Sequence, residues 1–315
     1  MTVDSTEILT ADNPNRFVIF PIHYNDVWQY YKQVVANFWS VEEIDTVSDS
    51  KQWDKLNESE RHFLSIIIAY LATEDSGNSK NIVQNFSKSI EIPEIRAFFG
   101  IQIAMENMHG EMYSSLLTQY ISDEAELRSL IDTTEHFEYH KEKKYWVEKW
   151  VNKSELSIGL RLAAYSVMKS IFFTGSYAAI KSLKKKSLLH GLTACTDNIF
   201  RDSSLYADFA VLLNNYVNVK PTTEYVSNLV EEAVAIETKF LNLTLPVAFI
   251  GLDCKKMTSY INYSADLILN QLGFPKLYNS ENTFDFVEKR VFVIDKKADK
   301  ILDKDNNSFN IIEDF

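Results

Sequence analysis

The sequence contains few of the residues that interrupt helices. Only 8 glycines and 6 prolines occur among its 315 residues. A β protein rich in turns needs more of both, so long helices are expected. The only two cysteines, Cys195 and Cys254, form no CxxC pair. This excludes a disulfide framework and is typical of a reducing, cytoplasmic compartment.

Long apolar runs and basic clusters are also missing. The longest apolar runs, such as residues 64–72, have about nine residues, which is too short to span a bilayer. The first 15 residues carry acidic groups and no apolar core, so they do not form a signal peptide. The net charge is −12, and no basic stretch alternates with aromatics, which argues against nucleic acid as a partner.

The sequence is rich in residues that can form a hydrophobic core, since 46% are hydrophobic and 13% are aromatic. We therefore expect a soluble, all-α protein with a flexible lead over residues 1–15, one helical domain over 16–278 and a flexible tail over 279–315. No internal repeat or Gly/Ser linker divides the domain.

Helical spacing of apolar residues begins near Tyr24, and Asn57 with Glu60 forms a capping-box pair before the next helix. Ser154 is the expected N-cap of a long helix that reaches residue 184. The other predicted helices cover residues 62–73, 82–92, 95–121, 123–131, 138–150, 192–217, a stretch from 222, and 257–272.

The stretch IQIAMENMHGEMYSSLL, residues 101–117, places three polar groups on one face of a predicted buried helix. Glu106, His109 and Tyr113 stand at i, i+3 and i+7 among apolar neighbours. A buried carboxylate and a buried imidazole each need a partner. Carboxylate-bridged di-iron helix bundles use such a Glu-x-x-His turn on each of two helices. The sequence therefore predicts half of a metal site here.

Several long blocks carry a family resemblance, which runs from about residue 13 to residue 288. The blocks NPNRFVIFPIHYNDVWQYYKQVVANFWSVEEIDT, FFGIQIAMENMHGEMYS, SIFFTGSYA, NIFRDSSLYADFA and NTFDFVE resemble eukaryotic small subunits of class I ribonucleotide reductase. The resemblance implies a ferritin-like helical bundle. It also implies a part in deoxyribonucleotide synthesis for DNA replication.

That family holds its di-iron centre with an Asp, a Glu-x-x-His, a lone Glu and a second Glu-x-x-His. By this resemblance three ligand positions are kept, namely Asp75, Glu106 and His109. The other three are replaced by Lys169, Ser203 and Tyr206. The resemblance also assigns the radical position to Tyr113, and the electron-transfer tryptophan and its aspartate partner to Trp39 and Asp202.

The replacements change the charge of the site. Two carboxylates remain and an ammonium is added, so Lys169 should repel a cation and pair with Asp75 or Glu106. Ser203 and Tyr206 are poor neutral ligands. We expect no cofactor or one weakly bound metal, not an intact di-iron centre. Taken singly, His109 and Tyr113 are also typical of a helical core, and Lys169 of a lysine that reaches solvent. Arg201 is expected to form a structural ion pair beside Asp202.

The tail differs from the family in one respect and resembles it in another. The chain has no tyrosine after Tyr278, so a tyrosine relay to the large subunit is not expected. The tip FNIIEDF resembles the family's docking peptide for the large subunit. Its predicted contact residues are Phe309, Ile311, Ile312, Glu313, Asp314 and Phe315. A generic acidic tail is the alternative.

Three functional hypotheses follow. The first is an auxiliary small subunit that acts with the large subunit and, as a heterodimer, with a ligand-complete small subunit, a homodimer being the other arrangement. The second is an atypical active subunit with one metal, or with a metal-free, modified Tyr113. The third is a non-catalytic regulator of the large subunit. None of them involves nucleic acid or a membrane.

Overall fold

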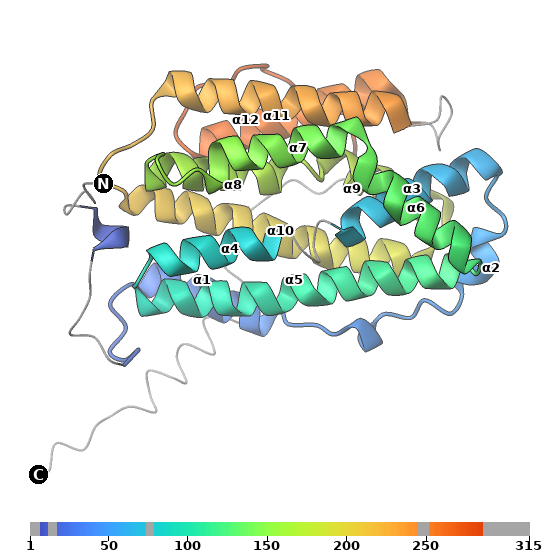
Figure 1. Ribbon diagram of the computed structural model, residues 1–315, viewed down its shortest axis with the longest axis horizontal. Helices are drawn as coiled ribbons and strands as arrows, with labels where there is room; N and C mark the ends of the chain where they lie inside the picture. The colour runs from blue at the N-terminus through green and yellow to red at the C-terminus, as the bar shows by residue number, and fades with distance from the viewer. Residues whose placement is uncertain (1–6, 12–17, 74–78, 245–251, 286–315) are drawn as a thin grey trace, which may run out of the picture.

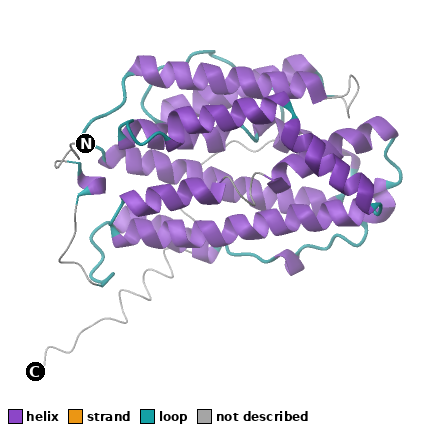
Figure 2. Cartoon of the chain, in the orientation of Figure 1, coloured by secondary structure: helices purple, strands orange, loops and turns teal. Residues whose placement is uncertain are grey.

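The computed structural model describes residues 7–11, 18–73, 79–244 and 252–285. Within these ranges helices are joined by loops and turns, and no strand occurs (Figure 2). The all-α prediction is therefore confirmed for the described part of the chain. Not one of the described helices has the length and apolar character that a bilayer crossing demands.

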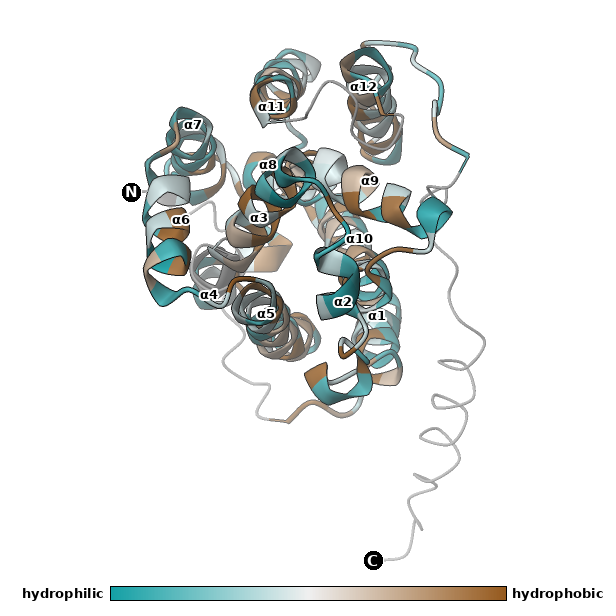
Figure 3. Cartoon of the chain, turned by 90° about the vertical axis from the view of Figure 1, so that its right-hand side faces the viewer, coloured by the Kyte–Doolittle hydropathy of each residue, from teal (hydrophilic) through white to brown (hydrophobic). Residues whose placement is uncertain are grey.

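A bundle of long helices forms the core (Figure 1). Its members are α3 (Glu58–Thr73), α5 (Pro93–Tyr120), α8 (Ile158–Ile171) and α10 (His190–Tyr216). In these helices apolar residues are buried along the faces that meet. The end-on view shows them around a common centre (Figure 3).

The remaining helices pack around this bundle. α1 contacts α5 and α10, α6 contacts α3, and α11 and α12 contact α8. The bounds of these elements are α1 (Asn25–Ala36), α2 (Asp49–Trp53), α4 (Ser79–Ser89), α6 (Glu124–His136), α7 (Glu138–Val147), α9 (Thr174–Ser182), α11 (Thr223–Thr244) and α12 (Cys254–Gln271). Short helical turns lie at η1 (Ile8–Thr10), η2 (Val41–Glu43), η4 (Glu148–Asn152) and η5 (Leu183–Lys186).

The predicted capping box before α3 is confirmed. The Glu60 backbone N–H donates to Asn57 Oδ1 at 2.9 Å, and the Asn57 N–H donates to Glu60 Oε2 at 3.1 Å. Both bonds satisfy backbone donors that the first turn of a helix leaves without partners.

Cys195 is buried and Cys254 exposed, and neither forms a disulfide.

The prediction of one helix from residue 154 to 184 is wrong. Ser157, not Ser154, is the N-cap of α8, because the Leu160 N–H donates to Ser157 Oγ at 3.3 Å. The helix also breaks at Phe172 and Phe173, and α9 begins at Thr174. Other helices supply partners for the backbone groups at this break, which local sequence does not reveal.

Both ends of the described chain are tied to the domain. Glu7, within the predicted lead, accepts a hydrogen bond from the Asn218 N–H at 3.0 Å, and Leu9 is fully buried. Beyond residue 278, the Ser280 N–H donates to Asp266 of α12 at 2.9 Å, and Phe284 is buried. The packed domain thus includes residues that we had assigned to the lead and the tail.

Candidate functional site

Helix α5 carries the predicted polar face into the centre of the bundle. Glu106 and Tyr113 are 0% exposed and His109 is 1% exposed. The interval of three to four residues keeps them on one side of the helix, as the periodicity predicted. This buried position gives each polar group a strong need for a partner.

Lys169 of α8 forms a buried ion pair with Glu106, which is one of the two partners, Asp75 and Glu106, that the sequence predicted. Its Nζ lies 2.9 Å from Glu106 Oε1, and the two side chains are 1% and 0% exposed. Gln102 Nε2, one turn earlier on α5, donates to the same oxygen at 3.0 Å. Gln102 Nε2 also contacts the Tyr165 hydroxyl. One carboxylate oxygen therefore joins the middle of α5 to the last turn of α8.

Aromatic rings surround the Lys169 ammonium. Its Nζ lies 6.0 Å from the ring centroid of Tyr165 and 5.8 Å from those of Phe173 and Tyr206. Ring faces attract a cation, and the attraction is stronger away from water. These contacts stabilise the charged form of a lysine that has no access to solvent.

The second oxygen of Glu106 has a different environment. Glu106 Oε2 and Gln102 Oε1 are buried, and neither finds a hydrogen-bond donor in the part of the chain that the structure describes. A buried acceptor without a donor costs free energy. Each of these two oxygens could therefore accept a further hydrogen bond.

Asp202 of α10 contacts both His109 and Trp39. Trp39 Nε1 donates to Asp202 Oδ2 at 2.9 Å, and His109 Nε2 lies 3.2 Å from the same oxygen. The Trp39 and His109 rings stack with their centroids 6.0 Å apart. The structure thus connects Trp39, Asp202 and His109 through one carboxylate oxygen.

Arg201 forms the predicted ion pair with its neighbour. Its Nη2 lies 3.2 Å from Asp202 Oδ1 and donates to the Asn37 carbonyl at 3.0 Å. The arginine therefore helps to hold the segment after α1 against α10.

Ser203 and Tyr206 occupy the same face of α10. Ser203 Oγ and the Tyr177 hydroxyl are 3.3 Å apart, so one donates to the other. The Tyr206 ring lies 6.4 Å from the His109 ring, centroid to centroid. Five of the six ligand positions thus meet in one buried cluster, namely Glu106, His109, Lys169, Ser203 and Tyr206.

Two sets of predicted residues cannot be placed. Asp75 lies outside the described residues, and so does the tip with Phe309, Ile311, Ile312, Glu313, Asp314 and Phe315. Among the residues that are described, no group of three or more His, Cys, Asp or Glu side chains could hold a metal ion.

The sequence analysis missed four residues of the cluster, namely Gln102, Tyr165, Phe173 and Tyr177. Helical periodicity contains a signal for two of them. Gln102 stands four residues before Glu106, and Tyr165 stands four residues before Lys169, so each shares a face with a predicted site residue. Phe173 and Tyr177 lie at or after the helix break, where periodicity gives no guide.

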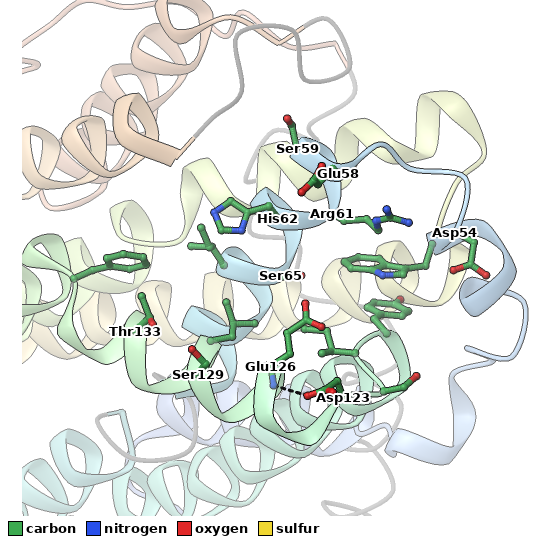
Figure 4. Close-up of a pocket in the computed structure, with 17 residues that line it drawn as sticks. Asp54, Glu58, Ser59, Arg61, His62, Ser65, Asp123, Glu126, Ser129 and Thr133 are labelled. Atoms are coloured by element: carbon green, nitrogen blue, oxygen red, sulfur yellow. Dashed lines mark hydrogen bonds between the residues drawn. The ribbon is translucent and has the colours of Figure 1, made fainter.

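A surface groove of about 1030 Å³ lies apart from this cluster, between the ends of α2, α3, α5 and α6 (Figure 4). Its lining includes the acidic residues Asp54, Glu58, Asp123 and Glu126 and the basic or titratable residues Arg61 and His62. Trp53 and Tyr120, whose rings stack 4.5 Å apart, also line it. None of the buried site residues lines this groove, so the two features are separate.

Comparison with known proteins identifies the family of the chain. The family described as "Ribonucleotide reductase, small chain" matches residues 16–284. The chain is 43% identical over 282 residues to a ribonucleoside-diphosphate reductase small chain of Spisula solidissima, covering 90% of this chain and 73% of that relative. It is 40% identical over 321 residues to the small chain of Variola virus, covering 98% of this chain and all of the relative.

Solved structures show the same architecture. The Rnr4 homodimer of ribonucleotide reductase from Saccharomyces cerevisiae is 32% identical, with a TM-score of 0.86, and the match covers 95% of this chain and 93% of that one. A class I ribonucleotide reductase from Bacillus halodurans, at 19% identity and a TM-score of 0.76, shares the fold. The predicted ferritin-like fold is therefore confirmed. From the family match and the identities above, the chain belongs to the small-chain family of ribonucleotide reductase, whose members normally bind a dimetal centre.

Proposed function

We propose that this chain is an auxiliary small subunit of ribonucleoside-diphosphate reductase, which does not form a di-iron tyrosyl radical of its own. It would support the holoenzyme by pairing with a ligand-complete small subunit and with the large subunit. The observation that carries this proposal is the buried ion pair between Lys169 and Glu106.

Charge balance is the physical reason. A di-iron centre of this family needs about four carboxylates to balance its two metal ions, with imidazole and oxygen atoms as ligands. Here an ammonium group sits 2.9 Å from one of the remaining carboxylates. A metal ion in its place would have to displace a buried cation from its carboxylate, and breaking such a pair costs about 3–5 kcal/mol. The donor set therefore does not fit a two-metal centre.

Ser203 and Tyr206 support the same conclusion. Neutral hydroxyl groups are weak ligands for iron compared with the carboxylate and imidazole of the family pattern. Ser203 is already in a hydrogen bond with Tyr177. Tyr113 would then be a vestige of the radical position, with Trp39 and Asp202 kept for the packing that they provide.

Two observations favour a second candidate, an active subunit with a single metal. His109 Nε2 faces Asp202, and metal-ligating histidines commonly direct one ring nitrogen to a carboxylate while the other binds the metal. Glu106 Oε2 also lacks a donor among the described residues. With Asp75, these two groups would form a three-ligand site. We favour the auxiliary role because Lys169 places a positive charge beside that site.

The partners follow from the family. The similar Rnr4 structure is a homodimer, which supports dimer formation by this chain. We propose that the tip FNIIEDF docks onto the large subunit. The third hypothesis, a regulator that acts through the tip alone, requires that the helical domain bind no other small subunit.

Elemental analysis and electron paramagnetic resonance of the purified chain, after addition of iron and oxygen, test the proposal. We expect well under two irons per chain and no tyrosyl radical signal. The matched control is the triple variant Lys169→Glu, Ser203→Glu, Tyr206→His, which restores the family ligand set and should take up more iron. Two irons with a radical in the unmodified chain would end the auxiliary proposal.

The other outcomes separate the remaining hypotheses. One tightly bound metal per chain would favour the single-metal candidate. A second measurement mixes the chain with a ligand-complete small subunit and follows heterodimer formation by native mass spectrometry. Binding to the large subunit without any heterodimer would favour the regulator.

A further inference from the structure

A second buried lysine–glutamate pair lies outside the site described above. Lys143 Nζ of α7 is 2.8 Å from Glu237 Oε2 of α11, and the two side chains are 2% and 0% exposed. Lys143 Nζ also donates to the Tyr70 hydroxyl at 3.0 Å and to the Phe172 carbonyl at 2.9 Å. Since an ammonium has three hydrogens, each of them has an acceptor.

This pair meets the break between α8 and α9. Lys143 bonds the Phe172 carbonyl, where α8 ends, and the Gly175 N–H donates to Glu237 Oε1 at 3.1 Å, where α9 begins. Helix ends leave carbonyl and N–H groups without intrahelical partners. The ion pair supplies partners for one group of each kind.

The charges also match the two helix ends. The ammonium lies at the C-terminus of α8 and the carboxylate lies at the N-terminus of α9, and both placements are favourable for the helix dipoles. Gly175 allows the close approach, because a Cβ atom at this position would overlap the Leu241 side chain of α11. Leu241 stands one turn after Glu237 on that helix.

The break between α8 and α9 lies between two residues of the buried site, Lys169 and Tyr177. Lys169 stands in the last turn of α8 and pairs with Glu106, while Tyr177 stands at the start of α9 and meets Ser203. The Phe173 ring, within the break, is near both buried ion pairs: its centroid is 5.8 Å from Lys169 Nζ and 6.0 Å from the ring of Tyr70, whose hydroxyl accepts from Lys143. A change in the break would therefore redirect residues on both of its sides.

We propose that Lys143 and Glu237 are positioning residues, which hold the α8–α9 break and so direct Lys169 and Tyr177 into the buried site. They contact neither Glu106 nor His109 and act through the backbone of Phe172 and Gly175. This inference goes beyond the proposed function, because it holds whether or not the chain binds a metal.

The test compares Glu237→Gln with Glu142→Gln in the full-length chain. Glu142 of α7 pairs with Lys239 of α11 at 2.5 Å, so the control removes an ion pair between the same two helices at the surface. Two quantities are measured: the exchange rate of the Gly175 amide hydrogen and the ¹⁵N resonance of the Lys169 ammonium. For Glu237→Gln we expect exchange at Gly175 to rise roughly tenfold or more, since the amide offers one acceptor oxygen to the two donors, Lys143 Nζ and the Gly175 N–H, that Glu237 now binds. Competition for that oxygen weakens the hydrogen bond of Gly175 and favours local opening. We also expect the Lys169 resonance to shift, and Glu142→Gln to change neither.

A purely structural role gives another pattern. Exchange that rises equally in α3, α5 and α10, with an unchanged Lys169 resonance, would overturn the proposal. If Glu237→Gln does not fold, the double variant Lys143→Met, Glu237→Met removes both charges, and such apolar replacements commonly keep the fold. In this double variant the Phe172 carbonyl and the Gly175 N–H also lose their partners. The exchange rate at Gly175 and the Lys169 resonance are then measured in the same way, and the same results support or overturn the proposal.

Discussion

The Lys169 ammonium and the Glu106 carboxylate lie 2.9 Å apart at the centre of the bundle, where neither has access to solvent. Burial of two charges is costly, and their attraction offsets the cost only when the geometry is good and further hydrogen bonds help. Gln102 supplies such a bond to the same oxygen, and three aromatic rings face the ammonium. The Lys169 ammonium therefore neutralises the buried Glu106 carboxylate.

Substitution of Lys169 alone should destabilise the protein. Lys169→Met leaves Glu106 as a buried charge without its cation, so we expect the free energy of unfolding to fall by about 3–5 kcal/mol. The measurement is urea denaturation followed by circular dichroism. Lys141→Met is the control, because Lys141 is 60% exposed and 4.0 Å from Glu138, and its loss should change the free energy by less than about 1 kcal/mol.

A double variant checks the cause. Lys169→Met combined with Glu106→Leu removes both charges and should recover most of the lost stability. If Lys169→Met alone melts like the unmodified chain, the ion pair has no net role in stability.

Acid sensitivity should depend in part on His140. This side chain is 1% exposed, and burial, followed by the charges of Lys143 and Lys144, lowers its pKa to about 3. In the unfolded chain the imidazole takes up a proton near pH 6.5. Between these two values the unfolded state binds more protons, so the free energy of unfolding falls as the pH falls. The slope from this residue is roughly 1.4 kcal/mol per pH unit within that window.

The check is the pH dependence of urea denaturation from pH 7 to pH 4. His140→Phe should flatten the acid side of the curve, whereas His136→Phe, at an exposed position, should leave it unchanged. Equal curves for His140→Phe and the unmodified chain would show that His140 accepts its proton in the folded state.

The start of α10 should tolerate no side chain at Gly191. A Cβ atom there would come within 2.8 Å of the Asp45 carbonyl oxygen and 2.9 Å of Asp49 Oδ2. Asp49 accepts the Gly191 and Leu192 N–H groups at 3.0 and 2.8 Å, so the clash would disturb the cap of α10. We expect Gly191→Ala to lower the free energy of unfolding by about 1–3 kcal/mol.

Gly100→Ala is the matched control for Gly191→Ala. Gly100 is exposed in the interior of α5, and apart from its own stretch of helix no atom of the described residues lies within 4 Å of a Cβ built there. Alanine there should stabilise the helix by about 0.5–1 kcal/mol. Equal effects of the two substitutions in urea denaturation would contradict the assigned clash.

The C-terminal tip should carry the affinity for the large subunit. Apolar anchors and acidic groups suit a segment that enters a groove on a basic surface, and FNIIEDF contains both. We expect deletion of residues 309–315 to weaken binding by at least about tenfold, the loss that corresponds to 1.4 kcal/mol, with an unchanged melting temperature of the helical domain. A synthetic FNIIEDF peptide should compete in a fluorescence anisotropy assay.

The peptide control replaces Phe309 and Phe315 by alanine and should not compete. Binding that is unaffected by the deletion would assign the docking to another part of the chain.

The sequence by itself determined the local features of this protein. The capping box of Asn57 and Glu60 and the inward face with Glu106, His109 and Tyr113 depend on hydrogen bonds and periodicity within a few residues. The resemblance to the family predicted where the site lies and which positions differ from the family pattern, namely Lys169, Ser203 and Tyr206. The capping box and the inward face were predictable because residues that are close in the chain decide them.

Only the tertiary structure decided which groups meet across the bundle. It placed Glu106 within 2.9 Å of Lys169, 63 residues away in the chain, and brought Gln102 and Tyr165 to that pair. It also ended the predicted helix at Phe172, where Lys143 and Glu237 bond the backbone groups of Phe172 and Gly175, 29 and 62 residues away in the chain. The physical reason is that a buried charge or an unpaired backbone group takes whatever partner the packing of distant helices brings within about 3 Å, and helical periodicity within one segment does not encode that distance.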